Sequence, residues 1–366
     1  MDNLSHTLTG LFLARTRLGS TSPLALPLLV AAANLPDVDI LWCSGQDSYL
    51  LHHRGITHSF AGLAVQTGLL AAFAALLERR RAARRREPAP PPAARRLSIL
   101  CAAGLASHLA LDWLNVYGVR PWLPFDARWH YGDIAFIVDP WIWLLLAAGG
   151  FLAAARTRAT SIALAVFGAL GAALILGSER APPRTGVVWI AGFATLAIAY
   201  ALSWGRGRPR AALAVSAILV TLYLGTLALF GRLADRAAAP ALAEARAAGE
   251  SVLSLTHLPA LARPLDWSVI VETPAAVYRR DVRLGGEHGP TQRVERRLDD
   301  PRTRTALEAV PGFQSFARLP FARLERRERG THVLLDDARY GRGTGDGSWC
   351  SAEVLVDAEG GAHALE

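Results

Sequence analysis

Lysine is absent from this chain of 366 residues, and all 39 basic side chains are arginines. Together with the many alanines, this points to a GC-rich genome rather than to a particular chemistry. The three cysteines, Cys43, Cys101 and Cys350, show neither CxxC spacing nor a disulfide framework, although a Cys43–Cys350 bridge is conceivable in an oxidising compartment. No HExxH, GxSxG or Walker sequence occurs, which argues against zincin proteases, serine hydrolases and P-loop enzymes.

A cleavable signal peptide is not evident either. The first residues lack a basic region and a small-residue cleavage site, so membrane entry is expected through internal helices. A hydrophobic fraction of 52% is high for a soluble protein but ordinary for a chain that is partly a membrane bundle. The formal charge of +8 would suit nucleic acid, but its densest arginine block lies between two apolar runs. We therefore expect a membrane-flanking basic loop and no direct nucleic-acid binding.

Apolar runs predict the fold class. A transmembrane helix needs about 20 apolar residues, and seven runs approach that length, preceded by a shorter one at 8–18. The sequence thus predicts a mainly α, polytopic transmembrane bundle of about seven to eight helices, with runs at 24–42, 59–77, 97–115, 134–155, 161–177, 186–204 and 211–230.

The chain divides by composition into three regions. Residues 1–145 contain all the candidate site residues, residues 146–232 supply further transmembrane helices, and residues 233–366 are polar. In this last region an amphipathic helix is expected at 237–249. Alternating apolar residues predict strands of a small β-rich domain at 267–271, 276–282, 332–335 and 352–356.

Arginine placement predicts orientation. The Arg/Pro-rich segment 78–96 is expected to be a disordered cytoplasmic linker. Counting spans from it puts every candidate ligand, and the C-terminal domain, on the extracytoplasmic side of a bacterial inner membrane.

Two pairs of residues share the spacing that places side chains on one helix face. His108 and Asp112 are four residues apart, as are Asp2 and His6. An imidazole beside a carboxylate suits a divalent ion such as Zn²⁺, with Mn²⁺ the alternative. The simpler interpretation of either pair is a hydrogen bond between helices. Ionisable groups in apolar runs are costly unless they pair, meet water or bind a cation, so two pairs favour a metal.

Further candidates lie where apolar runs end. His53 and His58 flank a turn, for which an interfacial loop is the plain alternative. Asp37 and Asp39 follow Pro36 at a break in an apolar run, where one carboxylate would bind metal and the other would act as a base; solvated acids at a helix end are the alternative.

Three residues further along complete the candidate set. Asp139 precedes Pro140, where a helix loses a hydrogen bond, and is expected to bind the metal or support a ligand. Arg120 and Arg128 could hold a phosphate by two-point contacts, or could equally well reach lipid headgroups.

Four segments in order resemble the YdjM-type family. They are DNLSHT at 2–7, LPDVD at 35–39, HRGITHS at 53–59 and SHLALDWLNVYG at 107–118, with IVDP at 137–140 extending the likeness over residues 1–145. Members of that family are described as LexA-regulated, inner-membrane, metal-dependent hydrolases with phospholipase-like activity. LexA regulation acts at the operator of a gene and implies no DNA contact by this chain.

The resemblance and the residues together predict a membrane-bound metal-dependent hydrolase of a phosphoester, such as a phospholipid headgroup. The expected metal ligands are His6, Asp37, His53, His58, His108, Asp112 and Asp139. Asp39 or Asp2 is expected to act as the base, and Arg120 or Arg128 to steady the phosphate. A structural metal site without activity and a transporter are the alternatives. A transporter should continue its ionisable groups toward the other membrane face, which these residues do not.

Overall fold

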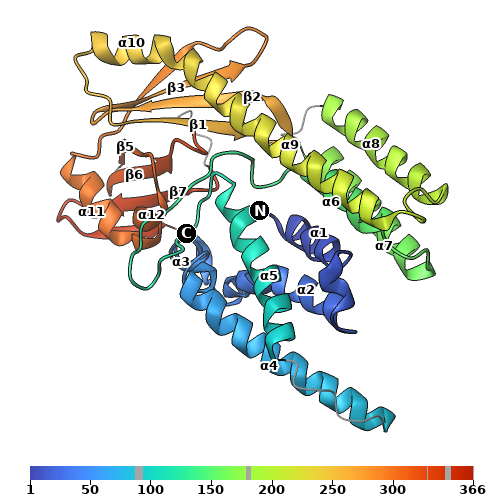
Figure 1. The fold of residues 1–366 in the computed structure, drawn as a ribbon. Helices are drawn as coiled ribbons and strands as arrows, with labels where there is room; N and C mark the ends of the chain where they lie inside the picture. The colour runs from blue at the N-terminus through green and yellow to red at the C-terminus, as the bar shows by residue number, and fades with distance from the viewer. Residues whose placement is uncertain (87–93, 179–182, 328, 343–347, 366) are drawn as a thin grey trace. The chain divides into compact units, whose positions relative to one another are not determined.

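The computed structural model describes the chain except for residues 87–93, 179–182, 328, 343–347 and 366. The described residues form two compact units. The first unit contains Met1–Val38, Ile56–Leu227 and Leu261–Arg263, and is helical. The second unit contains Asp39–Gly55, Ala228–Ala260 and Pro264–Glu366, and includes the strands (Figure 1).

The first unit starts with two short helices. α1 (Asn3–Leu13) begins where the Asp2 carboxylate accepts hydrogen bonds from the backbone N–H groups of Leu4 and Ser5. α2 (Ala25–Asn34) gives way to a 3₁₀ segment, η2 (Leu35–Trp42), because Pro36 cannot continue the hydrogen-bond pattern of an α-helix. α1 therefore begins earlier than the apolar run at 8–18 suggests.

Two longer helices pack beside them. α4 (Phe60–Arg85) begins with a Ser59 cap, whose hydroxyl accepts from the Gly62 N–H. α5 (Ala94–Trp113) lies against α2 and α4, and its buried leucines fill their shared core. In this first unit the N-terminal end of α4 and the C-terminal end of α5 meet at the same level (Figure 1).

The expected linker at 78–96 is helical at both described ends. α4 continues to Arg85, and α5 already begins at Ala94. Glu78 is buried, accepting a hydrogen bond from the Ser22 hydroxyl at 2.6 Å and an ion pair from Arg96 at 2.6 Å. These contacts order residues that look disordered by composition; residues 87–93 lie outside the described part.

The remaining helices of the first unit are apolar. They are α6 (Pro140–Leu152), α7 (Arg158–Leu176), α8 (Pro183–Ala201) and α9 (Pro209–Asp235). α7 starts with a reciprocal capping box between Thr157 and Thr160. α6 contacts α1 as well as α7 and α8, which joins these helices to the N-terminal group.

Five described stretches are long and apolar enough to cross a membrane: Ala25–Trp42, Phe60–Arg85, Arg158–Leu176, Arg184–Ala201 and Pro209–Ala247. The prediction of seven to eight such helices is therefore wrong for the described residues. α5 begins with arginines and ends with His108 and Asp112, which lowers its apolar character. α6 has only 13 residues, because the chain becomes helical at Pro140 rather than at 134.

The second unit contains two antiparallel sheets of four strands each. The first has the order β1 (Ser254–Ala260), β2 (Arg263–Glu272), β3 (Ala276–Arg283) and β4 (Thr291–Glu295). The second has the order β5 (Pro320–Arg327), β6 (Gly330–Asp337), β7 (Ser351–Val356) and β8 (Ala362–Leu365). The four strands predicted from alternation are confirmed as β2, β3, β6 and β7, and the helix expected at 237–249 is α10 (Ala239–Ala247).

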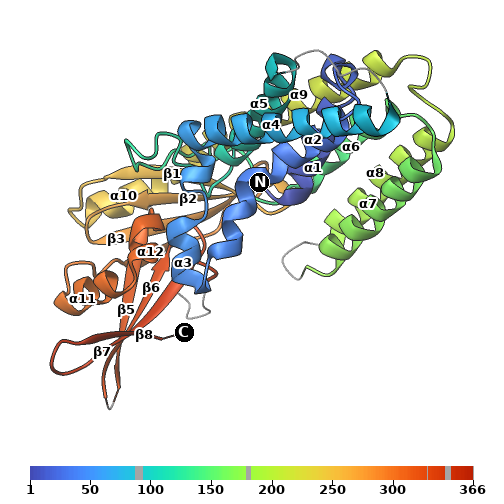
Figure 2. The same cartoon turned by 90° about the horizontal axis from the view of Figure 1, so that it is seen from below.

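Three helices of the second unit had no clear sequence signal. α11 (Pro301–Ala309) and α12 (Pro311–Phe316) connect the sheets, and α3 (Gly45–His52) comes from the N-terminal part of the chain. α3 packs against α12 (Figure 2). A segment between two motifs of the first unit thus belongs to the unit formed by the C-terminal strands.

Candidate metal centre

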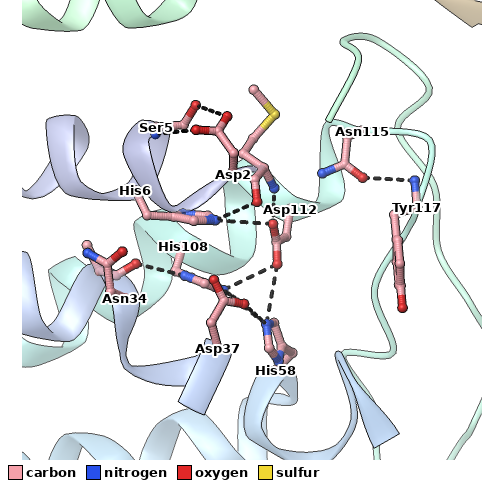
Figure 3. A network of polar contacts seen from close by, with 12 residues as sticks. Asp2, Ser5, His6, Asn34, Asp37, His58, His108, Asp112, Asn115 and Tyr117 are labelled. Carbon is pink, nitrogen blue, oxygen red and sulfur yellow. Dashed lines mark hydrogen bonds and ion pairs between the residues drawn. The ribbon is translucent and has the colours of Figure 1, made fainter. Parts of the chain in front are cut away.

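Four donor side chains converge at the ends of helices in the first unit. They are Asp37 from η2, His58 preceding α4, and His108 and Asp112 from the last turns of α5. His58 Nε2 lies 3.0 Å from His108 Nε2, 3.2 Å from Asp37 Oδ1 and 3.4 Å from Asp112 Oδ2. His108 Nε2 lies 3.6 Å and 3.2 Å from the same two oxygens (Figure 3). We call these four residues the donor group.

The distances within the donor group match a coordination shell. Zn²⁺ bound tetrahedrally at about 2.0–2.1 Å from each ligand holds those ligands about 3.3–3.4 Å apart. The five distances given above range from 3.0 to 3.6 Å around that value. The side chains of His58, His108 and Asp112 are fully buried, and that of Asp37 is 12% exposed. Buried carboxylates are costly unless they are paired with a positive group or bind a cation. The donor group therefore fits a divalent cation.

The tautomer of His108 is set by the backbone of α2. His108 Nδ1 lies 2.8 Å from the carbonyl oxygen of Ala33, which can only accept, so Nδ1 carries the proton and Nε2 presents its lone pair. Gly104, one turn earlier, allows this contact: a Cβ there would lie 2.5 Å from the Cβ of Ala32. α2 and α5 can approach closely only because position 104 is glycine.

His58 is oriented by its own turn. Its Nδ1 lies 3.0 Å from the Thr57 hydroxyl, while Nε2 faces the donor group. The following helix, α4, is capped by Ser59.

His6 contacts the far side of Asp112. Its Nε2 lies 3.3 Å from Asp112 Oδ1, whereas Asp112 Oδ2 faces His58 and His108. The terminal amino group of Met1 also pairs with Asp112 Oδ1. The ring of His6 stacks on that of His108 with 3.8 Å between centroids. Burial lowers the pKa of His6 to about 3, so its imidazole is neutral. His6 thus orients Asp112 and is not a member of the donor group.

Asp39 and His53 form a separate pair in the second unit. His53 Nδ1 lies 2.8 Å from Asp39 Oδ1, and the Arg54 N–H donates to Asp39 Oδ2 at 3.1 Å. Tyr49 stacks on the His53 ring at 4.6 Å. Both members of the pair are buried. Asp39, whose role as the base stays a prediction, contacts His53 and the turn that follows it.

Asp2 and Asp139 cap helices. Asp2 caps α1 and also accepts from the Trp143 indole N–H at 3.1 Å. Asp139 caps α6, accepting from the N–H groups of Trp141 at 2.9 Å and Ile142 at 3.1 Å, and from the Tyr223 hydroxyl at 2.9 Å. These contacts occupy both carboxylates. Both carboxylates thus cap helices, and the catalytic role predicted for Asp2 and the ligand role predicted for Asp139 stay predictions.

The two candidate phosphate-binding arginines differ in their surroundings. Arg128 is 83% exposed and pairs with Asp126 at 2.6 Å, a contact that keeps it in its own turn. Arg120 is buried, with its guanidinium 4.5 Å from the centroid of the Trp129 ring. Only Arg120 has the preorganised setting expected of an anion-binding side chain.

Several contributing residues gave little sequence signal. The Ala33 carbonyl and Gly104 are invisible to any search for ligand-type side chains, although both place His108. Asn34, a polar residue in the apolar run 24–42, contacts the Thr7 hydroxyl and the Val30 carbonyl and ties α1 to α2.

The model of the family described as YdjM inner membrane protein matches residues 1–181. Residues 1–181 belong to the YdjM family. The donor group lies entirely within this YdjM region, whereas α9, the sheets and α12 lie beyond it. Neither a curated protein nor a solved structure matches the chain. The family and the apolar helices make this an inner membrane protein with several candidate spans and a plausible metal site.

Proposed function

We propose that this chain is a membrane-bound, metal-dependent hydrolase that acts on a phosphoester such as a phospholipid headgroup. The observation that carries the proposal is the donor group, two imidazole nitrogens and two carboxylate oxygens 3.0–3.6 Å apart in a buried site. Nitrogen and carboxylate donors together suit Zn²⁺, with Mn²⁺ as the alternative.

The members of the donor group have different roles in this proposal. His58, His108 and Asp112 are fully buried and hold the cation. Asp37 is the partly exposed member, and it sits on a 3₁₀ segment rather than in a long helix. It is therefore the residue best placed to exchange a proton with water, and we assign it the role of general base.

The chemistry follows from these positions. A bound divalent cation lowers the pKa of water and draws charge from the phosphoryl oxygens. Asp37 removes a proton from the attacking water while the oxygen of that water forms a bond to phosphorus. The bond from phosphorus to the leaving alkoxide breaks. The alkoxide takes a proton from solvent. Arg120, held against Trp129, stabilises the phosphoryl charge.

Exposed apolar side chains support a lipid substrate. Ile56 and Phe60, two residues before and after His58, are 50% and 51% exposed. Phe60 contacts Trp122, itself half exposed, and Phe125 is 90% exposed. Large apolar side chains clustered around a polar site suit the membrane interface, where phosphoester headgroups are abundant.

The arginines support an extracytoplasmic site. His108 and Asp112 lie at the C-terminal end of α5, and Arg95 and Arg96 lie at its beginning. Thirteen residues from Arg95 to His108 correspond to about 20 Å along the axis, so the two groups occupy opposite ends of this helix. Arginines near membrane helices favour the cytoplasm, which supports an extracytoplasmic position for the donor group.

A structural metal site is the second candidate, because four buried protein donors can close a tetrahedral shell without admitting water. Metal analysis of the purified full-length protein tests both candidates. We expect about one Zn²⁺ or Mn²⁺ per chain, lost in His108→Ala and Asp112→Ala. His130→Ala, a histidine of the same unit outside the donor group, should retain the metal. Unchanged metal content in the first two variants would remove the metal centre.

The Asp37→Asn variant separates enzyme from structural site. The amide retains an oxygen donor but cannot act as a base at neutral pH. We expect metal content to change little and phosphate-ester release from phospholipid vesicles to fall about 10²- to 10⁴-fold. If the wild-type protein binds metal but releases nothing from vesicles or from a soluble phosphoester, the structural site is the better account.

A further inference from the structure

Residues 39–55, which we call the inserted segment, are attached to the C-terminal part of the second unit. α3 packs against α12, and Asp47 of α3 caps α12 from outside. Its two carboxylate oxygens accept from the N–H groups of Gly312 at 3.0 Å and Phe313 at 2.9 Å. N–H groups in the first turn of a helix have no partner within the helix, so Asp47 supplies what α12 itself lacks.

Two further contacts fix the same interface. The Gln46 amide donates to the carbonyl oxygens of Trp349 and Ser351, at 2.6 Å and 3.0 Å, beside strand β7. A Cβ at Gly312 would lie 1.9 Å from the Asp47 carbonyl oxygen. The backbone of α3 therefore approaches α12 as closely as it does because position 312 is glycine.

The inserted segment is also closed on itself. Asp39 near its start and His53 near its end pair at 2.8 Å, and both are buried. The ends of the segment are thus held together while its middle is held by α12.

Both ends of the inserted segment lead directly into the donor group. Asp37 lies two residues before Asp39, and His58 lies three residues after Gly55. A connection of about 20 residues samples many conformations when free, and this freedom opposes holding its two ends at one cation. Anchoring it in advance reduces the ordering required when the metal binds.

We propose that the second unit positions the metal centre by holding the inserted segment, with Asp47 as the positioning residue. This inference rests on the proposed metal centre and assigns a role to the region beyond the YdjM match, which ends at residue 181 while α12 spans 311–316. The element that packs against α12 is therefore α3 of the inserted segment, in the same chain.

The test compares two capping aspartates of the second unit. Asp47 caps α12 from the inserted segment, whereas Asp300 caps α11 from the residue preceding it and accepts from the Arg302 N–H at 2.9 Å. Asp47→Ala and the matched control Asp300→Ala each remove one carboxylate cap. Asp47→Asn keeps one acceptor oxygen, and Gly312→Ala introduces the Cβ that collides with α3.

Two measurements on full-length protein in detergent decide the outcome. The first is amide hydrogen exchange of residues 56–63 without metal, and the second is Zn²⁺ affinity by competition with a chelating dye. We expect Asp47→Ala and Gly312→Ala to increase the exchange and to weaken Zn²⁺ binding about five- to tenfold, the size of effect expected for losing one cap. Asp47→Asn should change the exchange of residues 56–63 and the Zn²⁺ affinity less than Asp47→Ala does. Asp300→Ala should leave both quantities at their wild-type values.

Wild-type exchange at 56–63 in Asp47→Ala and Gly312→Ala would overturn the inference, as would an equal effect in Asp300→Ala. Wild-type Zn²⁺ affinity in variants whose residues 56–63 exchange faster than in wild type would also overturn it. A wild-type protein that binds no Zn²⁺ would contradict the proposed function instead, and the exchange measurement would still decide whether Asp47 holds residues 56–63 in place.

Discussion

Buried acids in this chain acquire their stabilisation in different ways. Asp337 pairs with Arg339 at 2.9 Å, with both side chains inaccessible to solvent. Asp112 instead faces two histidines and is the residue around which the donor group forms. Among the described residues, Asp336 has neither an ion pair with an arginine, as Asp337 has, nor facing histidines, as Asp112 has. It accepts from the Ser348 hydroxyl and the Asp337 N–H, but burial, together with the neighbouring Asp337 charge, raises its pKa to about 6.

The Asp336→Asn variant should be more stable than wild type above pH 6. A carboxyl whose folded-state pKa is about 6, against about 3.9 when unfolded, contributes stability that is present below pH 4 and lost as the pH rises through 6. The amide oxygen can still accept both hydrogen bonds. We expect a gain that is near zero at pH 4 and reaches up to about 3 kcal/mol at pH 7.

Hydrogen-exchange protection of the β6 and β7 amides, corrected for the intrinsic rate at each pH, measures this difference. A gain of equal size at pH 4 and pH 7 would show that the effect is not electrostatic. Loss of protection at every pH would mean that the charged form is required for the Asp336 contacts.

At the scale of secondary structure, the site depends on where helices begin and end. Asp37 follows α2 and His58 precedes α4, while His108 and Asp112 lie in the last turns of α5. Helix ends leave backbone groups without partners and bring the chain to the boundary between apolar core and polar turns. Acidic residues at these ends can therefore be either caps or ligands, and only their contacts distinguish the two.

Asp139 is the clearest case of a cap, and its replacement tests that assignment. Asp139→Ala removes two hydrogen bonds at the start of α6 and leaves the Tyr223 hydroxyl without its acceptor. We expect it to lower the free energy of unfolding by about 1–2 kcal/mol, the range for N-cap loss. Metal content should stay at the wild-type value, because Asp139 is outside the donor group.

Thermal unfolding and metal analysis of the same Asp139→Ala sample provide the two measurements. Tyr223→Phe, which removes only the hydroxyl, should cost less than Asp139→Ala. Loss of metal at unchanged stability would return Asp139 to the set of ligands.

At the scale of the whole chain, topology links the donor group to the C-terminal domain. α5 runs away from the arginines at its start, α7 and α9 each begin just after arginines, and α9 leads into the second unit. If arginine-rich ends face the cytoplasm, the donor group and the residues after α9 are extracytoplasmic.

Labelling with a membrane-impermeant maleimide tests this orientation. In a variant without Cys43, Cys101 and Cys350, a single cysteine would replace either Arg84 near the end of α4 or Glu287 in the exposed turn after β3. We expect Glu287→Cys to react in intact cells and Arg84→Cys to react only after permeabilisation. The reverse pattern would place the second unit in the cytoplasm.

The sequence was informative where a pattern is local. Alternation predicted β2, β3, β6 and β7, and the i, i+4 spacing of His108 and Asp112 placed both on one face of α5. The sequence was less informative about which of several candidate residues with the same spacing come together in the fold. Spacing gave Asp2 and His6 the same status as His108 and Asp112, although one aspartate caps a helix and the other joins the donor group.

By itself, the sequence determined that apolar helices of membrane length alternate with polar turns, and that ligand-type side chains gather at those turns. Both properties follow from side-chain chemistry and its period along the chain. Only the tertiary structure decided which of these side chains meet. A glycine at 104 sets the approach of α2 and α5, a carbonyl at 33 fixes the His108 tautomer, and contacts with α12 attach residues 39–55 to the C-terminal unit. These contacts join residues up to 266 positions apart, and no local pattern records them.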